Sequence, residues 1–339
     1  GYHMPTLFLL GVTMKHILVC GAGGFIGSHL VTRLKNIPTQ DNYVVGVDIK
    51  QPEYINDADE FRILDLTNQH AVDDFFMRNH FDVVYQLAAD MGGADYIFTG
   101  DNDLDIITNS VQINLNVIDA VRTYNIPKIF YSSTACVYPE RNQEDPNNID
   151  CKEDSVYPAE PDSEYGWEKL FSERLYMNLH KHTNTEVRIA RFHNIFGPSS
   201  EYDSGKEKAP AALCRKVAEC PNGGSIDVYG SGEQLRSFLY ITDCLDAVED
   251  LMLSGYSAPV NIGSDYTISI NDLAHQIISF SNKNITINNI DVPQVGVVAR
   301  TSDNELFDRV IGTSRQVSLP DGLEKLYRWI DSRVNGINS

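Results

Sequence analysis

The sequence predicts an α/β protein built on a doubly wound parallel sheet, followed by a smaller mixed region. Short apolar runs rich in β-branched residues alternate with helical stretches through the first half of the chain, which is the pattern of parallel strands covered by helices on both faces. A cluster of glycines directly follows the first run, and beyond residue 192 Pro, Gly and Asn recur. We therefore expect a first domain over residues 14–192 and a second region over 193–339, part of which returns to the sheet.

The elements follow one another in a regular order. The expected strands are the apolar runs at 16–20, 43–47, 81–87, 128–132 and 187–190. The helices between them are expected at about residues 25–34, 67–80, 105–125 and 162–182. Shorter helices are expected near 208–219, 243–254, 270–281 and 320–334. We expect the second region to pack over the carboxyl edge of the sheet, where open α/β folds bind their ligands.

Composition and charge exclude several classes of protein. The 339 residues are 42% hydrophobic and 22% charged, which is typical of a folded chain. The net charge of −20 has the wrong sign for a nucleic acid partner. No apolar run approaches the roughly 20 residues that cross a membrane, so we expect a cytoplasmic protein without a membrane partner. The residues before Met14 are expected to lie outside the fold.

Cysteine and histidine spacing argues against disulfides and metals. The six cysteines have neither Cys-x-x-Cys spacing nor the density of a disulfide scaffold, so we expect reduced thiols. His180 and His182 lie near the end of an expected helix and lack a third ligand at a suitable spacing. No metal site is expected.

The glycine cluster predicts a dinucleotide site. Gly21–Gly27 lies between the first strand and the first helix, where glycines let the backbone turn and approach a pyrophosphate at the helix N-terminus. Asp48 ends the second strand, where its carboxylate can accept from ribose hydroxyls and would repel a 2′-phosphate. The cofactor is therefore expected to be NAD, on a Rossmann-type sheet. Asp65 can bind adenine or can serve the N-terminus of the next helix, and the sequence leaves both open.

A tyrosine and a lysine lie four residues apart in the helix expected at 162–182. The spacing places Tyr165 and Lys169 on one helical face, where the cation can favour the phenolate and make the tyrosine a usable base. The run Ser132–Cys136 follows a strand that ends nearby. Together with the glycine turn, this set resembles the extended short-chain dehydrogenase/reductase family, which includes NAD-dependent epimerases and dehydratases. The resemblance covers nearly the whole chain from Lys15.

The resemblance implies transient oxidation of a nucleotide sugar at C4, with Thr134 assisting Tyr165 and Lys169. Dehydratases of the family carry an acidic pair where this chain has Ala135 and Cys136, so a 4,6-dehydratase is disfavoured. Simple 4-epimerases usually have Thr at the position of Cys136. A thiol near positive charge is a stronger base for removing a proton from carbon beside a ketone, so Cys136 favours proton exchange at carbon.

Inversion of a carbon also needs a proton donor on the opposite face. Lys208 would be assigned to solvated surface on its own, but the run around it resembles the members of the family that invert two ring carbons of a GDP-sugar. That resemblance implies catalytic roles for Thr134, Cys136, Tyr165, Lys169 and Lys208. It implies cofactor contacts for Gly21, Gly24, Phe25, Ile26, Gly27, Asp48, Asp65, Leu66, Ala88, Tyr165 and Lys169. It implies substrate contacts for Gly93, Ala94, Thr134, Ala135, Cys136, Asn194, Glu207, Lys208, Lys216, Gln234, Arg236 and Arg300.

The two arginines of that set have forked donors suited to a pyrophosphate. Two positions depart from the GDP-sugar pattern: Thr134 replaces a Ser, and Ala94-Asp95-Tyr96 replaces a more apolar continuation after Gly93. Alternatives are a 4-epimerase, a decarboxylase or a 3,5-epimerase of another GDP-sugar, and a non-catalytic NAD-binding protein. The resemblance also implies a homodimer formed through the helices at 105–125 and 162–182.

Overall fold

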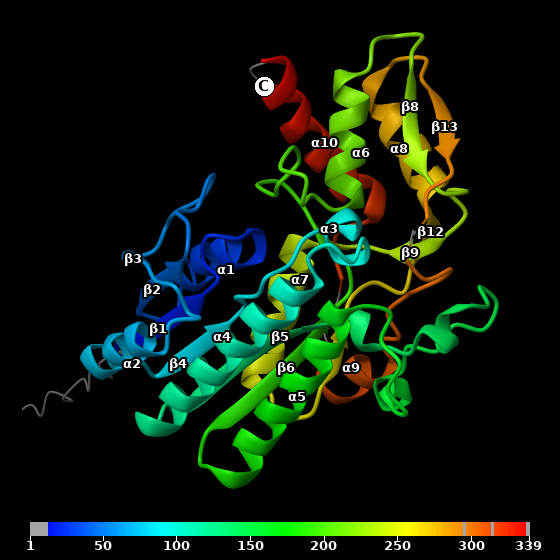
Figure 1. Cartoon of the computed structure of the whole chain (residues 1–339). Coiled ribbons are helices and arrows are strands. Elements are labelled where there is room, and N and C mark those ends of the chain that lie inside the picture. Colours follow the sequence, from blue (N-terminus) through cyan, green and yellow to red (C-terminus); the bar gives the residue numbers. More distant parts are fainter. Residues whose placement is uncertain (1–12, 294–295, 313–314, 337–339) are drawn as a thin grey trace, which may run out of the picture.

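The computed structural model describes residues 13–293, 296–312 and 315–336 (Figure 1). Its centre is a seven-stranded parallel sheet in the order β11-β6-β5-β4-β1-β2-β3, which confirms the predicted fold class. The strands are β1 Lys15–Cys20, β2 Asn42–Asp48, β3 Glu60–Ile63, β4 Val83–Gln86, β5 Lys128–Thr134, β6 Glu186–Phe192 and β11 Val260–Ile262.

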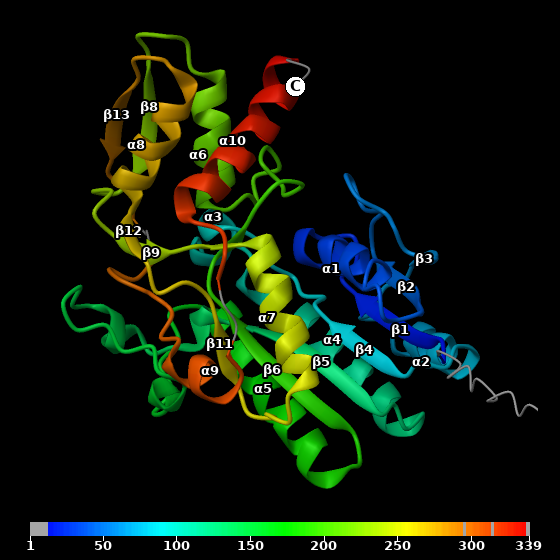
Figure 2. The ribbon, with the colours of Figure 1, turned by 180° about the vertical axis from the view of Figure 1, so that it is seen from behind.

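Alternating side chains of the strands enter two separate cores. In β1, Ile17 and Val19 belong to the cluster on one face, whereas Leu18 and Cys20 belong to the cluster on the other. Helices α2, α4 and α5 cover the second face, and α1 and α7 cover the first (Figures 1 and 2). Their bounds are α1 Phe25–Lys35, α2 Gln69–Arg78, α4 Asp103–Thr123, α5 Glu164–His182 and α7 Ile241–Leu253.

Two elements of the first half differ from the sequence expectation. Strand β3 lies outside the expected strand ranges, because its sequence Glu-Phe-Arg-Ile is charged at alternate positions and half exposed at the edge of the sheet. The short helix α3, Ala94–Phe98, was not expected either. The strand expected at 81–87 is shorter, since β4 begins at Val83 and ends at Gln86.

The second region consists of helices and small strand pairs above the carboxyl ends of the sheet. The pairs are β10–β7 and β13–β8, both parallel, and β12–β9, antiparallel. The elements are β7 Ile195–Phe196, α6 Ala209–Glu219, β8 Ser225–Tyr229, β9 Leu235–Ser237, β10 Leu239–Tyr240, β12 Thr267–Ser269, α8 Ile270–Ser281, β13 Thr286–Ile290, α9 Glu305–Val310 and α10 Leu319–Asn335.

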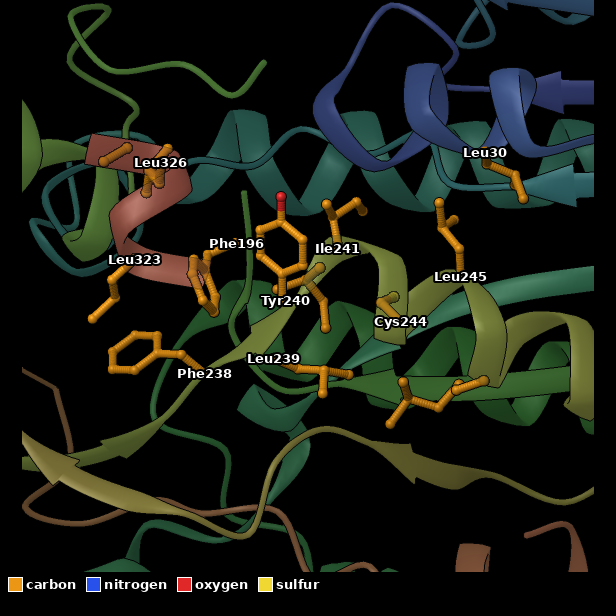
Figure 3. Close-up of a cluster of buried hydrophobic side chains, with 14 of the residues drawn as sticks. Leu30, Phe196, Phe238, Leu239, Tyr240, Ile241, Cys244, Leu245, Leu323 and Leu326 are labelled. Carbon is orange, nitrogen blue, oxygen red and sulfur yellow. The ribbon is translucent and has the colours of Figure 1, made fainter. Parts of the chain in front are cut away.

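A continuous core joins the second region to the sheet. Figure 3 shows Leu30 of α1, Leu245 of α7 and Leu326 of α10 among the side chains of one buried cluster. Both β11, which is a strand of the sheet, and α7, which covers one face of the sheet, lie beyond residue 192. The division at residues 192/193 stays a prediction, as does the cytoplasmic location. All six cysteines are free. Across the described ranges, no helix has the length and apolar character needed to cross a membrane.

Candidate active site

A cleft of about 910 Å³ lies between the sheet and the second region. The residues predicted for the cofactor all line it: Gly21, Gly24, Phe25, Ile26, Gly27, Asp48, Asp65, Leu66, Ala88, Tyr165 and Lys169. The other predicted catalytic and substrate residues line it too: Gly93, Ala94, Thr134, Ala135, Cys136, Asn194, Glu207, Lys208, Lys216, Gln234, Arg236 and Arg300. The structure thus brings the predicted set into one cleft, and the individual roles stay predictions.

The turn between β1 and α1 has no room for a side chain at Gly21, Gly23 or Gly27. Gly21 has a φ of +81°, and a Cβ at Gly27 would lie 2.1 Å from the carbonyl oxygen of Gly21. Gly24 is the N-cap of α1 and offers no side chain to the first-turn N–H groups, so these donors suit a phosphate. This backbone cradle fits the pyrophosphate of a dinucleotide.

Two carboxylates line the cofactor end. Asp48 accepts from the backbone N–H of Gly23 at 2.9 Å and of Ile49 at 2.7 Å, and burial raises its pKa. Asp65 accepts from the N–H and hydroxyl of Thr67 at 3.0 and 2.7 Å. Asp65 therefore stabilises the turn that leads into α2 while also lining the cleft, so both interpretations of this residue remain compatible with the structure.

Helix α5 carries Tyr165 and Lys169 into the cleft. Ser163 caps the helix by accepting from the N–H of Gly166 at 3.1 Å, and Lys169 Nζ donates to the carbonyl of Ser132 at 2.6 Å. Burial lowers the pKa of Lys169 from 10.5 to about 8. Burial also raises the pKa of Tyr165 well above its usual range; the charge of Cys136 adds to this rise and a hydrogen bond with Thr134 opposes it. In this structure burial therefore outweighs the effect of the neighbouring cation that the sequence suggested.

Cys136 and Lys208 reach the cleft from different regions. Cys136 lies in a short 3-10 helix, Ala135–Val137, at the end of β5, and Lys208 is the N-cap residue of α6. The side chain of Lys208 is open to the cleft, but the surrounding protein displaces bulk water and lowers its pKa, while the charge of Cys136 opposes this shift. The two groups are therefore close enough to influence each other electrostatically.

The segment before Lys208 is tied to the start of α3. The N–H of Gly93 donates to the carbonyl of Lys206 at 2.9 Å, and a Cβ at Gly93 would lie 2.2 Å from the carbonyl oxygen of Glu207. The ammonium of Lys206 lies 4.2 Å from the ring centroid of Tyr96. Only glycine fits at position 93, because the backbone of Lys206 and Glu207 lies so close to it. This close approach fixes the chain directly before Lys208.

Two arginines lie at the sugar end: Arg300 is buried and Arg236 is half-buried. Arg236 donates to the carbonyl of Val297 at 2.8 Å; burial, followed by the charge of Arg300, lowers the pKa of Arg236 to about 10. Although burial lowers it, the charges of Cys136 and Asp162 raise the pKa of Arg300 overall. Two guanidinium groups whose positive charges repel each other in one part of the cleft are suited to an anionic ligand.

The remaining predicted substrate residues line the wall of the second region. Asn194, with a φ of +45°, donates to the carbonyl of Ser237 at 3.1 Å. Lys216 Nζ donates to the carbonyl of Asp227 at 2.8 Å and lies 4.6 Å from the ring centroid of Tyr229. Gln234 donates to the carbonyl of Tyr229 at 3.3 Å.

Sequence reasoning missed the side chains that support this site. Gln143 and Asp162 contact Arg300, and Tyr96 donates to Asp90 at 2.6 Å. Gln143 and Arg300 are 157 positions apart, so no local pattern could have paired them. The one available signal was Tyr96, which lies in the segment that departs from the family pattern.

Comparisons with known proteins agree with this geometry. Residues 17–263 match the model of the NAD dependent epimerase/dehydratase family. The chain is 39% identical to the GDP-mannose 3,5-epimerase of Arabidopsis thaliana, over 94% of this chain and 82% of that protein. Its fold resembles UDP-glucuronic acid 4-epimerase from Bacillus cereus in complex with UDP-glucuronic acid and NAD, with a TM-score of 0.77, 26% identity and coverage of 94% of this chain and 99% of that one.

A second solved structure shows the same fold at lower identity. UDP-glucose 4-epimerase from Thermotoga maritima, with UDP-glucose, has a TM-score of 0.80 at 21% identity, covering 94% of this chain and 99% of that one. The glycine cradle, the Tyr165–Lys169 pair and these matches lead to one conclusion. The chain belongs to the NAD-dependent epimerase/dehydratase family of nucleotide-sugar enzymes, and its cofactor is NAD.

Proposed function

We propose that this chain inverts C5 and C3 of a GDP-sugar, and that the sugar is GDP-mannose. The observation that carries the proposal is the meeting of Cys136 and Lys208 in the cleft that also holds Tyr165 and Lys169. Two groups able to exchange protons with carbon thus accompany the pair suited to C4 oxidation. The similarity to the Arabidopsis GDP-mannose 3,5-epimerase supports this choice of reaction and sugar.

The first step prepares the carbons for exchange. NAD held by the Gly21–Gly27 turn and Asp48 would supply the acceptor and afterwards the donor of the C4 hydride. Tyr165 takes the proton of the C4 hydroxyl. Burial opposes its phenolate, while the hydrogen bond with Thr134 and the positive charge of Lys169 favour it. A ketone at C4 acidifies the hydrogens on C3 and C5, because the electron pair left on carbon can move to the carbonyl oxygen. Since the ketone is reduced again, the reaction consumes no cofactor.

Cys136 and Lys208 then exchange protons at carbon. The thiolate of Cys136 takes the C5 proton, so that a C–H bond breaks and an S–H bond forms. The ammonium of Lys208 delivers a proton to the opposite face, so that an N–H bond breaks and a new C–H bond forms. The lowered pKa of Lys208 suits this transfer, because it makes the ammonium a stronger acid and so a better proton donor near neutral pH. The thiol of Cys136 then loses its proton to solvent and the amine of Lys208 takes one up. The same exchange at C3 completes the second inversion.

We also propose that two copies of the chain associate through α4 and α5. These helices lie side by side and expose apolar side chains: Leu115 is 41% exposed, Trp167 43% and Phe171 49%. A second copy would cover this apolar face. Static light scattering on the purified protein is expected to give twice the chain mass, and a monomer would contradict the dimer.

The test of the reaction is incubation of the purified protein with GDP-mannose in D2O without added NAD. Deuterium at C5 and C3, with new L-galactose or L-gulose signals in the NMR spectrum, is the expected result. Complete retention of protium, even with NAD supplied, would overturn the GDP-mannose assignment. Inversion at C4 without deuterium at C3 or C5 would favour a 4-epimerase, because the hydride returns from the cofactor and not from solvent.

A further inference from the structure

The sulfur of Cys136 lies beside a buried guanidinium. Nη1 of Arg300 is 3.4 Å from Sγ of Cys136, a hydrogen-bonding distance for sulfur, and Arg300 is 6% exposed. A cation beside a cysteine favours the thiolate over the thiol. Because a guanidinium does not lose its proton in proteins, Arg300 keeps its positive charge beside the sulfur at every pH at which the protein is folded.

Gln143 fixes the orientation of that guanidinium. Nε of Arg300 donates to Oε1 of Gln143 at 2.5 Å, and Nε2 of Gln143 donates to the carbonyls of Tyr138 and Pro139 at 3.1 and 2.9 Å. A backbone hydrogen bond joins the same two segments, since the N–H of Ala299 donates to the carbonyl of Gln143 at 3.0 Å. Gln143 is fully buried, so its amide cannot turn without losing these bonds.

Asp162 provides a partial counter-charge. Its Oδ2 lies 3.4 Å from Nη2 of Arg300, and its side chain is 6% exposed. Within the described ranges, its second oxygen Oδ1 is buried without a hydrogen-bond partner. Asp162 directly precedes Ser163, the N-cap of α5. The charge of Arg300 is therefore divided between a carboxylate and a sulfur.

We propose that Arg300 is a positioning residue that holds Cys136 as a thiolate, that Gln143 fixes its orientation, and that Asp162 limits its charge. This inference rests on the proposed function of Cys136 as the base for C5. It gives Arg300 a task besides any contact with the pyrophosphate. The thiolate is then ready before the sugar binds, and the C5 proton moves to a sulfur that already carries the electron pair.

The test is alkylation of Cys136 by iodoacetamide at neutral pH without sugar. The thiolate forms a carbon–sulfur bond and iodide leaves, and mass spectrometry of the Cys136 peptide measures the rate. The other five cysteines are buried, so the reaction is selective. Arg300→Met should slow alkylation about tenfold, and Gln143→Met should slow it less.

Asp162→Asn supplies the discriminating result. It keeps the shape of the side chain but removes the counter-charge, so alkylation should become about threefold faster. A purely structural role would move both substitutions in the same direction, since loosening of the site exposes the thiol in either case. If Arg300→Met does not fold, Asp162→Asn still decides. A rate in Asp162→Asn that is unchanged or slower would overturn the inference.

Arg33→Met is the matched control. It removes one half-buried guanidinium that pairs with Asp246 and Glu249 between α1 and α7, and it should leave the alkylation rate of Cys136 unchanged. The D2O experiment separates the two proposals. If the unmodified protein exchanges deuterium but the variants do not show the expected order of alkylation rates, only the proposed role of Arg300 is contradicted. If the variants show the expected order of alkylation rates but the unmodified protein exchanges no deuterium, the proposed reaction is contradicted.

Discussion

The two ends of the cleft are built in different ways. At the cofactor end, one short segment, Gly21–Gly27, presents backbone groups and leaves no room for a side chain at Gly21, Gly23 or Gly27. At the sugar end, Cys136, Lys208 and Arg300 come from three separate segments and act through charged side chains. The first end depends on steric room for the backbone, and the second on a balance of charges. Substitutions should therefore affect folding and NAD binding at the first end and proton transfer at the second.

The largest effect is expected from Cys136→Ser at the sugar end. A serine hydroxyl is not ionised near neutral pH, so deuterium exchange at C5 should fall about a thousandfold. Oxidation at C4 should persist, visible as absorbance of the reduced cofactor after GDP-mannose is added. NMR and absorbance on the same sample measure the two steps. A matching fall in both would show that the two ends are not independent.

Lys169 lies where the two ends meet, and its titration should appear in stability. Its pKa is about 8 in the folded chain and 10.5 ordinarily, so the unfolded chain binds more protons between these values. Stability should therefore rise with pH across this window, by up to about 3 kcal/mol. Urea denaturation of the protein and of Lys169→Met should diverge over this range, with the rise confined to the unsubstituted chain. Parallel curves would contradict it.

At the cofactor end, Gly27→Ala should reduce stability by about 2 kcal/mol and release NAD. The added Cβ would lie 2.1 Å from a backbone oxygen, which has little freedom to move. Gly255→Ala is the matched control, because a Cβ there meets nothing within 4 Å. Thermal unfolding and the NAD content of the purified protein measure both. Equal behaviour of the two variants would refute the steric argument.

The smallest effect is expected at the ion pair between the cofactor end and the second region. Lys50, just after β2, lies 2.8 Å from Glu201, and its side chain is 57% exposed. Solvent screens such a pair, so Lys50→Met should change the free energy of unfolding by less than about 1 kcal/mol. A larger loss in urea denaturation would mean that this pair holds the two regions together.

The same contrast explains which features could be predicted from sequence. The glycine turn and Asp48 are local signals, because each lies where a strand ends. The pairing of Tyr165 with Lys169 follows from helical spacing alone. The contacts of Gln143 and Asp162 with Arg300 depend on how loops from distant segments meet, which periodicity does not encode. Strand β3 could not be predicted from an apolar run, because a half-exposed edge strand does not need one.

Strand β11 sets a limit on how this protein can be divided for recombinant expression. It pairs with β6 at the edge of the sheet, although it lies nearly 70 residues further along the chain. A fragment ending at residue 192 would keep the pairing of β6 with β5 but leave the other edge of β6 unpaired at Ala190–Phe192, and it would remove α7 from one face of the sheet. Bare edges and uncovered apolar faces promote aggregation. A soluble NAD-binding fragment would therefore have to extend past Ile262.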